Sequence, residues 1–205
     1  MNPQKLKINK EKINIFEIGA GDAFCSKTLN YWGNNKYDIT LFEPNPILYK
    51  SLLKKVKDIN NIKLYNIAIF NEEKIGELVC AGVLSYIRDI PSPINTIYLN
   101  KLNEILSEFT IPVNFMKFDS FDKGDIDYLI LGMEGSEFTV FQSLISRPHI
   151  ISLHNYFAND YKYTFPYFDY IENWCVKNNY YIIFGIPNIL LVNKKSIENE
   201  TLVLN

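Results

Sequence analysis

Short apolar runs alternate with stretches of helical periodicity in the first third of the chain. Three of these runs are rich in β-branched residues and have the length of buried strands: residues 13–18, 38–42 and 62–67. Between them, residues 24–32 and 47–56 carry apolar side chains at helical spacing, and Pro46 stands at a favourable first helical position. The order strand, helix, strand, helix, strand predicts a parallel sheet with helices on its faces.

The same alternation returns in the second half of the chain, after a less regular middle. The pattern there predicts strands at residues 128–131 and 150–153, helices at 138–145 and 167–178, and a terminal hairpin at 180–184 and 189–192. In the middle, residues 76–80 and 113–118 are strand candidates, residues 81–93 are loop-like, and residues 94–106 are weakly helical. The whole pattern indicates an α/β fold.

The length of the chain fits a single domain over residues 1–205. Hydrophobic residues make up 47% of it, well above the share in disordered chains. Residues 1–12 form a polar N-terminal segment without the apolar core of a secretory signal, and residues 195–205 are expected to form a tail. No apolar stretch reaches the length of a membrane span.

Charge and cysteine usage exclude several classes of partner. Lys and Arg number 21 against 23 Asp and Glu, a net charge of −2, which disfavours nucleic acid as a ligand. Cys25, Cys80 and Cys175 are far apart and show no metal-binding spacing, so we expect neither a disulfide framework nor a metal site. A reducing cytoplasm, with no membrane contact, is the expected location.

The strongest local signal is a glycine-rich turn after the first predicted strand. The strand ends on Glu17, and Gly19, Ala20 and Gly21 follow it; glycine permits both strained backbone angles and close approach of a ligand. Glu43 ends the second predicted strand, where an acidic side chain can accept hydrogen bonds from both hydroxyls of a ribose. This combination predicts a nucleotide-type ligand at the carboxyl edge of the sheet.

Either a dinucleotide or S-adenosylmethionine would fit such a turn. Glu17 would repel the pyrophosphate of a dinucleotide, whereas it suits the ammonium group of the methionine moiety. Phe24 also fills the position of the last glycine in the dinucleotide motif. The residues therefore favour S-adenosylmethionine.

Four stretches resemble the FkbM-like methyltransferases, a branch of the class I S-adenosylmethionine-dependent fold. They are residues 17–24, 41–45, 117–121 and 127–137. The last is the most specific, because Asp127-Tyr128-Leu129-Ile130-Leu131-Gly132-Met133-Glu134-Gly135-Ser136-Glu137 is similar to the family's D-L-L-K-I-D-V-E-G-A-E. The order and spacing of the four stretches match over most of the chain.

The resemblance implies a Rossmann-like, seven-stranded, mostly parallel sheet of order 3-2-1-4-5-7-6, with helices on both faces. It also implies an O-methyltransferase that uses S-adenosyl-L-methionine and acts on a hydroxyl of a sugar, glycan or other small molecule. The residues expected to bind the cofactor are Glu17, Gly19, Ala20, Gly21, Phe24, Glu43, Pro44, Ala68, Gly132 and Met133.

The chain departs from the family pattern at the fourth motif. Ile130 and Gly132 replace the family's Lys and Asp, and His154 replaces an acidic residue after the fifth strand. The loss of acidic character at Gly132 motivates an alternative function, a catalytically degenerate methyltransferase fold that only binds. A nicotinamide-dependent oxidoreductase is a further alternative.

His154 and Glu134 are the candidate catalytic residues. His154 follows the fifth strand at its carboxyl end, so it is the candidate general base or acceptor ligand; His149 should lie at the opposite edge. Glu134 is the candidate for positioning the acceptor, whereas Glu137 better fits a charge near a helix N-terminus. Asp119 and Asp122 fit either the crevice or a solvated turn.

The remaining length leaves little room for a separate substrate domain. Recognition of the acceptor should therefore come from an insertion at residues 81–112 over the site and from the aromatic-rich residues 156–167. A second subunit, in a homodimer, is the other source of such a surface.

Overall fold

The main sheet of the protein has the predicted strand order. The computed structural model describes residues 6–23, 26–82, 85–90, 109–154, 168–185 and 188–204. The order is β4-β3-β2-β9-β10-β12-β11, which is 3-2-1-4-5-7-6 along the chain. β12 is antiparallel to both of its neighbours, and the other adjacent pairs are parallel. The strands are β2 (Ile13–Ile18), β3 (Tyr37–Phe42), β4 (Ile62–Tyr65), β9 (Tyr128–Leu131), β10 (Ile150–His154), β11 (Tyr180–Ile183) and β12 (Asn188–Asn193).

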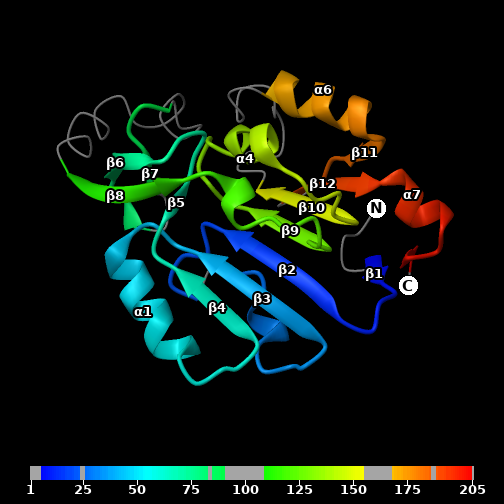
Figure 1. The fold of residues 1–205 in the computed structure, drawn as a ribbon, viewed down its shortest axis with the longest axis horizontal. Helices are drawn as coiled ribbons and strands as arrows, with labels where there is room; N and C mark the ends of the chain where they lie inside the picture. The colour runs from blue at the N-terminus through cyan, green and yellow to red at the C-terminus, as the bar shows by residue number, and fades with distance from the viewer. Residues whose placement is uncertain are drawn as a thin grey trace.

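Helices cover both faces of this sheet, as predicted (Figure 1). On one face, α4 (Phe138–Ser143) and α6 (Phe168–Asn178) share an apolar cluster with alternate residues of β2, β9 and β10. On the other face, Leu52 and Val56 of α1 (Pro46–Val56) pack in a second cluster. Adjacent strand residues such as Leu129 and Ile130 point to opposite clusters, because side chains alternate across a strand.

The start of α1 follows from its local sequence. The side chain of Asn45 accepts hydrogen bonds from the backbone N–H groups of Ile47 and Leu48, and Pro46 occupies the first turn. An Asn cap satisfies donors that the helix itself leaves without partners, and proline loses nothing at that position. The prediction of this helix is confirmed.

The prediction of a helix at residues 24–32 is wrong for the part of that segment that the structure describes. The structure has only a short 3-10 turn, η2 (Leu29–Tyr31), and Phe24 and Cys25 lie outside the described residues. The backbone N–H groups of Lys27 and Thr28 donate to the Glu17 carboxylate. This side chain therefore draws the segment onto the sheet, and the tertiary contact overrides helical periodicity.

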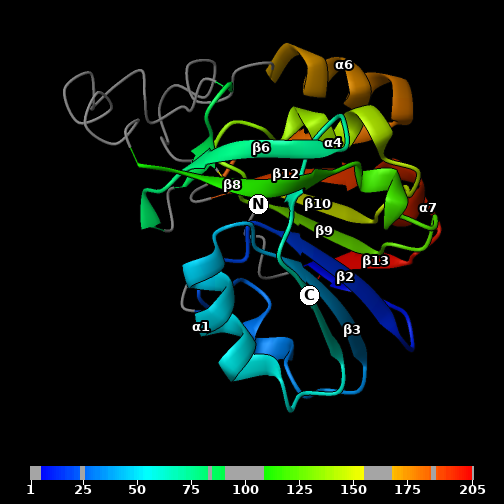
Figure 2. The ribbon, with the colours of Figure 1, turned by 60° about the vertical axis from the view of Figure 1, so that its left-hand side comes forward.

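A second sheet, of order β5-β8-β6-β7, was not predicted. It consists of β5 (Ala68–Ile69), β6 (Lys74–Val79), β7 (Tyr86–Ile87) and β8 (Thr110–Met116). Figure 2 shows β6 and β8 extending beside α4 and away from the main sheet. The expected insertion at residues 81–112 thus contributes β7 and the start of β8, whereas the helix expected at residues 94–106 lies outside the described residues.

Both ends of the described chain are folded together. β1 (Leu6–Ile8) pairs antiparallel with β13 (Leu202–Leu204), after α7 (Lys194–Glu198) (Figure 1). The predicted tail at residues 195–205 is therefore largely a helix and a strand, because Ile8 and Leu202 bury their side chains against the main sheet. No helix in the described ranges is long and apolar enough to cross a lipid bilayer.

Candidate functional site

The glycine turn lies at the carboxyl end of β2, where the chain leaves the sheet. Gly19 has a φ of +79° and Gly21 a φ of +68°, in the left-handed region that favours glycine. The backbone N–H groups of Gly19 and Ala20 both donate to the carbonyl of Phe42 at the end of β3. These bonds fix the turn against the neighbouring strand and leave the edge of the sheet open toward a pocket.

A pocket lies over the ends of β2, β3 and β9. The second sheet closes its other side with apolar side chains that include Leu78, Tyr86 and Ile87. Six of the residues predicted to bind the cofactor line this pocket: Gly19, Glu43, Pro44, Ala68, Gly132 and Met133. The structure therefore gathers residues from four separate parts of the chain around one space.

Glu43 is the buried acidic group in the pocket wall. Its Oε2 accepts a hydrogen bond of 2.7 Å from the Gly21 N–H, and its Oε1 accepts one of 2.8 Å from the Asn45 N–H. Only 4% of the residue is exposed. Burial raises the pKa of Glu43 to about 7, with Asp22 and Glu17 adding to the rise and the two hydrogen bonds opposing it.

Glu17 lies beneath the turn and does not line the pocket. Its carboxylate accepts hydrogen bonds from the hydroxyl groups of Ser26 and Thr28 and from the backbone N–H groups of Lys27 and Thr28. Burial raises the pKa of Glu17, and these hydrogen bonds oppose the rise. Both oxygens are thus engaged by the loop, although Glu17 was predicted to bind the cofactor.

The other three predicted cofactor residues have different surroundings. Ala20 is fully buried in the apolar cluster on the α1 face, and the Gly21 N–H is directed at Glu43. Phe24 lies outside the described residues. The pocket wall thus contains six of the ten residues predicted to bind the cofactor. Gly21 is not among the six, but its N–H group holds the Glu43 carboxylate that is.

The turn after β9 holds the two acidic residues of the fourth motif. Glu137 folds back on this turn, and its carboxylate accepts hydrogen bonds from the N–H groups of Met133 and Gly135, at 3.2 and 2.9 Å. Burial raises the pKa of Glu137, and these hydrogen bonds oppose the rise. Glu134 is 4% exposed and has a φ of +52°, a strained angle for a residue other than glycine. Glu137 therefore supports the turn, while Glu134 occupies its tip.

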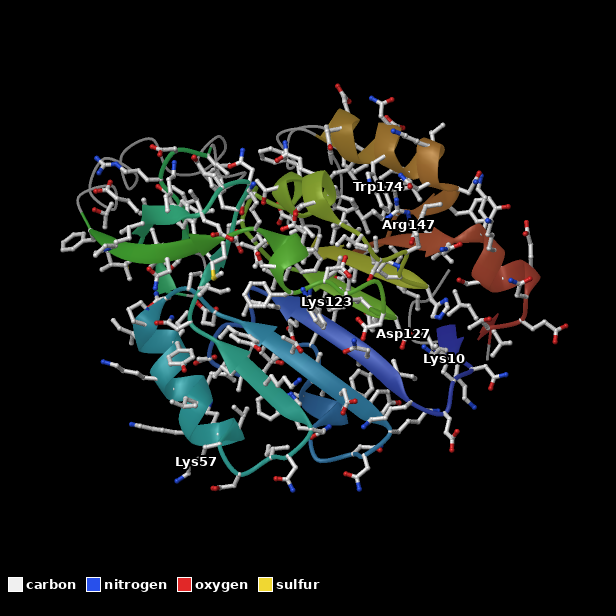
Figure 3. The ribbon with its side chains drawn as sticks, viewed as in Figure 1. Lys10, Lys57, Lys123, Asp127, Arg147 and Trp174 are labelled. Carbon is white, nitrogen blue, oxygen red and sulfur yellow. The ribbon has the colours of Figure 1, made fainter. Side chains whose placement is uncertain are left out.

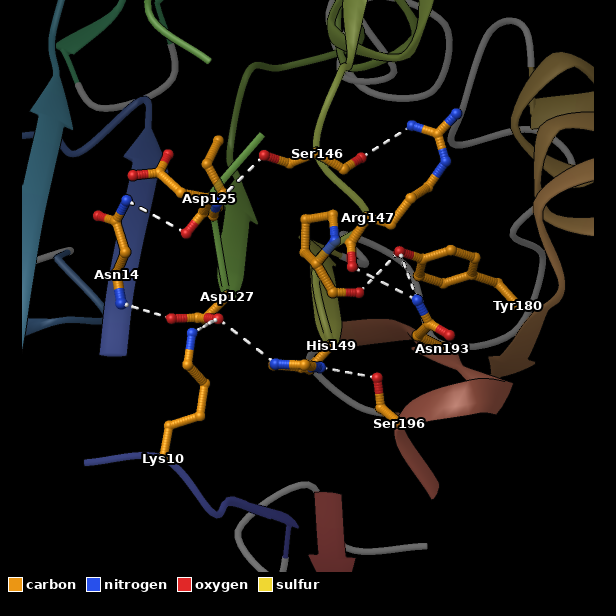
Figure 4. A network of polar contacts seen from close by, with 12 residues as sticks. Lys10, Asn14, Asp125, Asp127, Ser146, Arg147, His149, Tyr180, Asn193 and Ser196 are labelled. Carbon is orange, nitrogen blue, oxygen red and sulfur yellow. Dashed lines mark hydrogen bonds and ion pairs between the residues drawn. The ribbon is translucent and has the colours of Figure 1, made fainter. Parts of the chain in front are cut away.

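The two histidines lie at opposite edges of the sheet. The backbone of His154 ends β10 at the carboxyl edge and pairs in register with Asn188, but its side chain lies outside the described part. His149 precedes β10 at the other edge, as expected, between Asp127 and Ser196 (Figure 4). The candidate role of His154 stays a prediction, and the position of His149 removes it from the pocket.

Asp122 also lies away from the pocket. Its carboxylate is buried and accepts hydrogen bonds from the backbone N–H groups of Gly124, Ile145 and Ser146 and from the Ser146 hydroxyl. It joins the segment before β9 to the end of α4, and Asp119 lies in the 3-10 turn η4 (Phe118–Ser120). Both the crevice and the solvated-turn interpretations of Asp122 are therefore wrong, because its carboxylate is fully buried and its oxygens are used in this connection.

Lys27 also lies at this edge and was not among the predicted site residues. Its Nζ donates a hydrogen bond of 3.1 Å to the Asn188 side chain at the start of β12. Burial lowers the pKa of the Lys27 amine, and the carboxylates of Glu17, Glu137 and Glu134 oppose the shift. No sequence signal marks it, because Asn188 is 161 positions away. In the described ranges, no three His, Cys, Asp or Glu side chains gather as metal ligands would.

Comparison with known proteins gives a family match. The model of the FkbM methyltransferase domain matches residues 17–182. No curated protein matches the chain.

Several solved structures are similar to the chain at low identity. TYW2 of P. horikoshii, in complex with MeSAdo, is 15% identical with a TM-score of 0.47; the match covers 90% of this chain and 57% of that one, so this chain spans little more than half of its length. The precorrin-6y C5,15-methyltransferase of Geobacter metallireducens is 12% identical, with a TM-score of 0.44 and coverage of 90% and 82%. TrmK of M. capricolum, in complex with S-adenosyl-homocysteine, is 11% identical, with a TM-score of 0.42 and coverage of 89% and 62%.

Proposed function

Since the chain belongs to the FkbM methyltransferase family, we propose that it transfers a methyl group from S-adenosylmethionine to a hydroxyl of a sugar, glycan or other small molecule. The cofactor, when bound, supplies an electrophilic methyl group on a sulfonium. The observation that carries the proposal is the buried Glu43 carboxylate in the wall of a pocket that Gly19 and Gly132 also line.

The residues of the pocket fit the parts of this cofactor. Each Glu43 oxygen accepts one backbone N–H and keeps a second acceptor site, so the carboxylate can also accept the two ribose hydroxyls, next to the glycine turn that permits a close approach. The side chains of Leu48, Leu78 and Ile87 give the pocket an apolar wall suited to the adenine ring. The backbone of Gly132 and Met133 completes the wall toward β9.

The acceptor in this proposal is neutral and hydroxylated. The net charge of −2 and the buried carboxylates at the carboxyl edge disfavour a polyanion such as RNA. Nucleic acid and membrane are accordingly not the proposed partners. The second sheet and residues 156–167 are the proposed sources of acceptor recognition, the latter outside the described residues, with a homodimer as the alternative source.

Isothermal titration with S-adenosylmethionine and S-adenosylhomocysteine tests the cofactor assignment. We expect saturable binding that Glu43→Gln weakens by about tenfold or more, because the charged acceptor of two hydrogen bonds is lost. Glu72→Gln is the matched control, because Glu72 is exposed and pairs with the surface residue Lys74. The absence of heat with either ligand would contradict the proposal.

Transfer of radiolabelled methyl groups to a panel of methyl glycosides tests the reaction itself. Labelled glycoside is the expected product. Binding of S-adenosylmethionine without transfer would favour the degenerate binding protein that Gly132 suggests. Saturable binding of a nicotinamide dinucleotide in its place would favour an oxidoreductase.

A further inference from the structure

The Lys27 amine lies at the carboxyl edge of the main sheet, on the far side of β9 from the pocket. The pocket walls come from β2, β3, β9 and the second sheet, whereas Lys27 reaches Asn188 at the start of β12. Asn188 pairs with the backbone of His154, so the amine lies beside the end of β10. In parallel α/β sheets, ligands bind in the crevice beyond these ends. Lys27 is thus placed next to the cofactor pocket without forming part of it.

The surroundings of Lys27 are acidic, yet no described carboxylate neutralises it directly. Glu17 from β2, together with Glu134 and Glu137 from the connection between β9 and α4, act on its charge. No carboxylate oxygen of a described residue lies within 4.0 Å of the Lys27 Nζ, the distance that defines an ion pair. Glu17 and Glu137 bind backbone N–H groups of their own loops. The hydrogen bond to Asn188 therefore leaves capacity on the amine for a further partner.

Partial burial favours the uncharged form of the Lys27 amine. The cost of removing an ammonium group from water lowers the pKa of Lys27, and this cost outweighs the attraction of the three carboxylates. An uncharged lysine amine is a proton acceptor, which is the property that a general base requires. Exposed lysines of the chain, such as Lys57 at the end of α1, lack this burial (Figure 3).

We propose that Lys27 is a catalytic residue that contacts the acceptor hydroxyl and takes its proton during methyl transfer. The inference rests on the proposed function. The acceptor oxygen forms a bond to the methyl carbon, while the carbon–sulfur bond breaks and its electron pair stays on sulfur as a thioether. The hydroxyl proton passes to the uncharged amine, which becomes an ammonium group and later returns the proton to water. Asn188 orients the amine throughout.

The same site selects against an acidic acceptor. A carboxylate or phosphate next to Lys27 would also face Glu17, Glu134 and Glu137, all of which are buried. Like charges repel strongly where water is excluded. A neutral alcohol avoids this repulsion and still offers a proton to the amine. The acceptor class that fits Lys27 is therefore an uncharged hydroxyl compound.

Competitive labelling of amines with acetic anhydride, read by peptide mass spectrometry across pH, tests the state of Lys27 without a known acceptor. We expect Lys27 to be labelled at lower pH than Lys57 in the same sample. Asn188→Leu should leave the amine reactive, because it removes an orienting partner and no carboxylate. The inference would be overturned if Lys27 were labelled only at the pH at which Lys57 is labelled, or at a higher pH. It would also be overturned if Lys27 were not labelled in the folded protein.

A kinetic comparison separates catalysis from a structural role. With glycosides that the wild type methylates, Lys27→Met and Lys27→Arg should lower kcat by about 10²- to 10⁴-fold and remove the fall of kcat at acidic pH. Binding of S-adenosylmethionine should be unchanged, and Lys57→Met is the control. Equal kcat in Lys27→Met would overturn the inference. If the wild type did not bind S-adenosylmethionine, that result would instead contradict the proposed function, so the two failures are distinguishable.

Discussion

Gly19 and Gly132 bring the backbones of two neighbouring strands into contact where each leaves the sheet. A Cβ atom on Gly19 would lie 2.0 Å from the carbonyl oxygen of Gly132 and 2.8 Å from its carbonyl carbon. A Cβ atom on Gly132 would meet only the Gly19 oxygen at 3.5 Å and the Ile18 oxygen at 3.8 Å, which are ordinary contacts. The contact thus requires glycine at position 19 and tolerates a side chain at position 132.

Gly19→Ala should therefore be far more damaging than Gly132→Ala. The first adds a clash with backbone and a side chain at a φ of +79°, and we expect it to cost about 2–5 kcal/mol of stability and to abolish cofactor binding. The second should cost less than about 1 kcal/mol. Urea unfolding and titration with S-adenosylmethionine measure both effects, and equal losses in the two variants would refute this account.

The Glu43 carboxyl should make cofactor binding depend on pH. Its pKa of about 7 means that it is largely protonated at pH 6 and ionised at pH 8. In the proposed role of Glu43, the ionised form is the stronger acceptor for the two ribose hydroxyls, so affinity should rise with pH, by about tenfold between pH 6 and pH 8. Titration calorimetry at both values gives the change, and Glu43→Gln should bind weakly and equally at the two.

The same raised pKa has an opposite effect on the protein without cofactor. A carboxyl whose pKa is higher in the fold than in the unfolded chain stabilises the fold at low pH, and this contribution is lost as pH rises from the unfolded value toward 7. Because the cofactor is expected to bind more tightly at pH 8, it should protect the fold more at pH 8 than at pH 6. Thermal unfolding with and without S-adenosylhomocysteine would show this, and equal protection would contradict it.

The main sheet was predictable because its signals are local. Runs such as residues 13–18 and 128–131 have the length and composition of buried strands, and Glu43 was found because strand, acid and proline are consecutive. The order of the strands came from the resemblance to a family, since periodicity does not specify which strands pair. Residues predicted at these strand ends, such as Glu43 and Gly132, line one pocket for the same reason.

The parts that were missed depend on contacts between distant positions. Strands β5 and β7 have two residues each, too few for a periodic signal, and they exist through pairing with β8 and β6. In the segment predicted as a helix at residues 24–32, the Lys27 and Thr28 N–H groups bind Glu17 instead, and the Lys27 amine is positioned by Asn188 and has its pKa lowered by burial. None of these interactions is visible in a window of sequence.

Asp127 should stabilise the edge of the sheet opposite the pocket. It accepts hydrogen bonds from Lys10 and the Asn14 N–H and lies 3.4 Å from His149 Nε2 (Figures 3 and 4). Burial alone would raise its pKa, but the bonds from His149, Lys10 and Asn14 together lower it. This contribution is present above the ordinary aspartate pKa and is lost as pH falls through the lower folded value.

Asp127→Asn should therefore lower the free energy of unfolding by about 1–3 kcal/mol at pH 7, and the gap from wild type should narrow at pH 3. Asp38→Asn is the matched control, because its pair with Lys12 is exposed on both sides and should contribute less than about 1 kcal/mol. Urea unfolding at the two pH values measures both variants. Equal losses of unfolding free energy in the two variants would show that burial of the Asp127 pair does not contribute to stability.

Ser85 should control how firmly the second sheet closes the pocket proposed to hold the cofactor. Its hydroxyl accepts hydrogen bonds from the Asn45 side chain at 3.1 Å and from the Ala81 N–H at 3.1 Å, and donates to the Gly82 carbonyl at 2.6 Å. Asn45 caps α1 and also donates its N–H to Glu43. The hydroxyl thus joins the loop before β7 to the residue that positions the acidic group of the pocket.

Ser85→Ala removes these bonds while leaving the pocket wall otherwise intact. Because each neutral hydrogen bond contributes about 1 kcal/mol, we expect S-adenosylmethionine to bind roughly three- to thirtyfold more weakly. The global unfolding free energy should change less, since Ser85 lies in a connection and the main cores are untouched. Ser120→Ala, which alters a hydroxyl on the exposed η4 turn, is the control and should bind as the wild type does. Unchanged affinity in Ser85→Ala would mean that the second sheet holds the pocket closed through its apolar contacts alone.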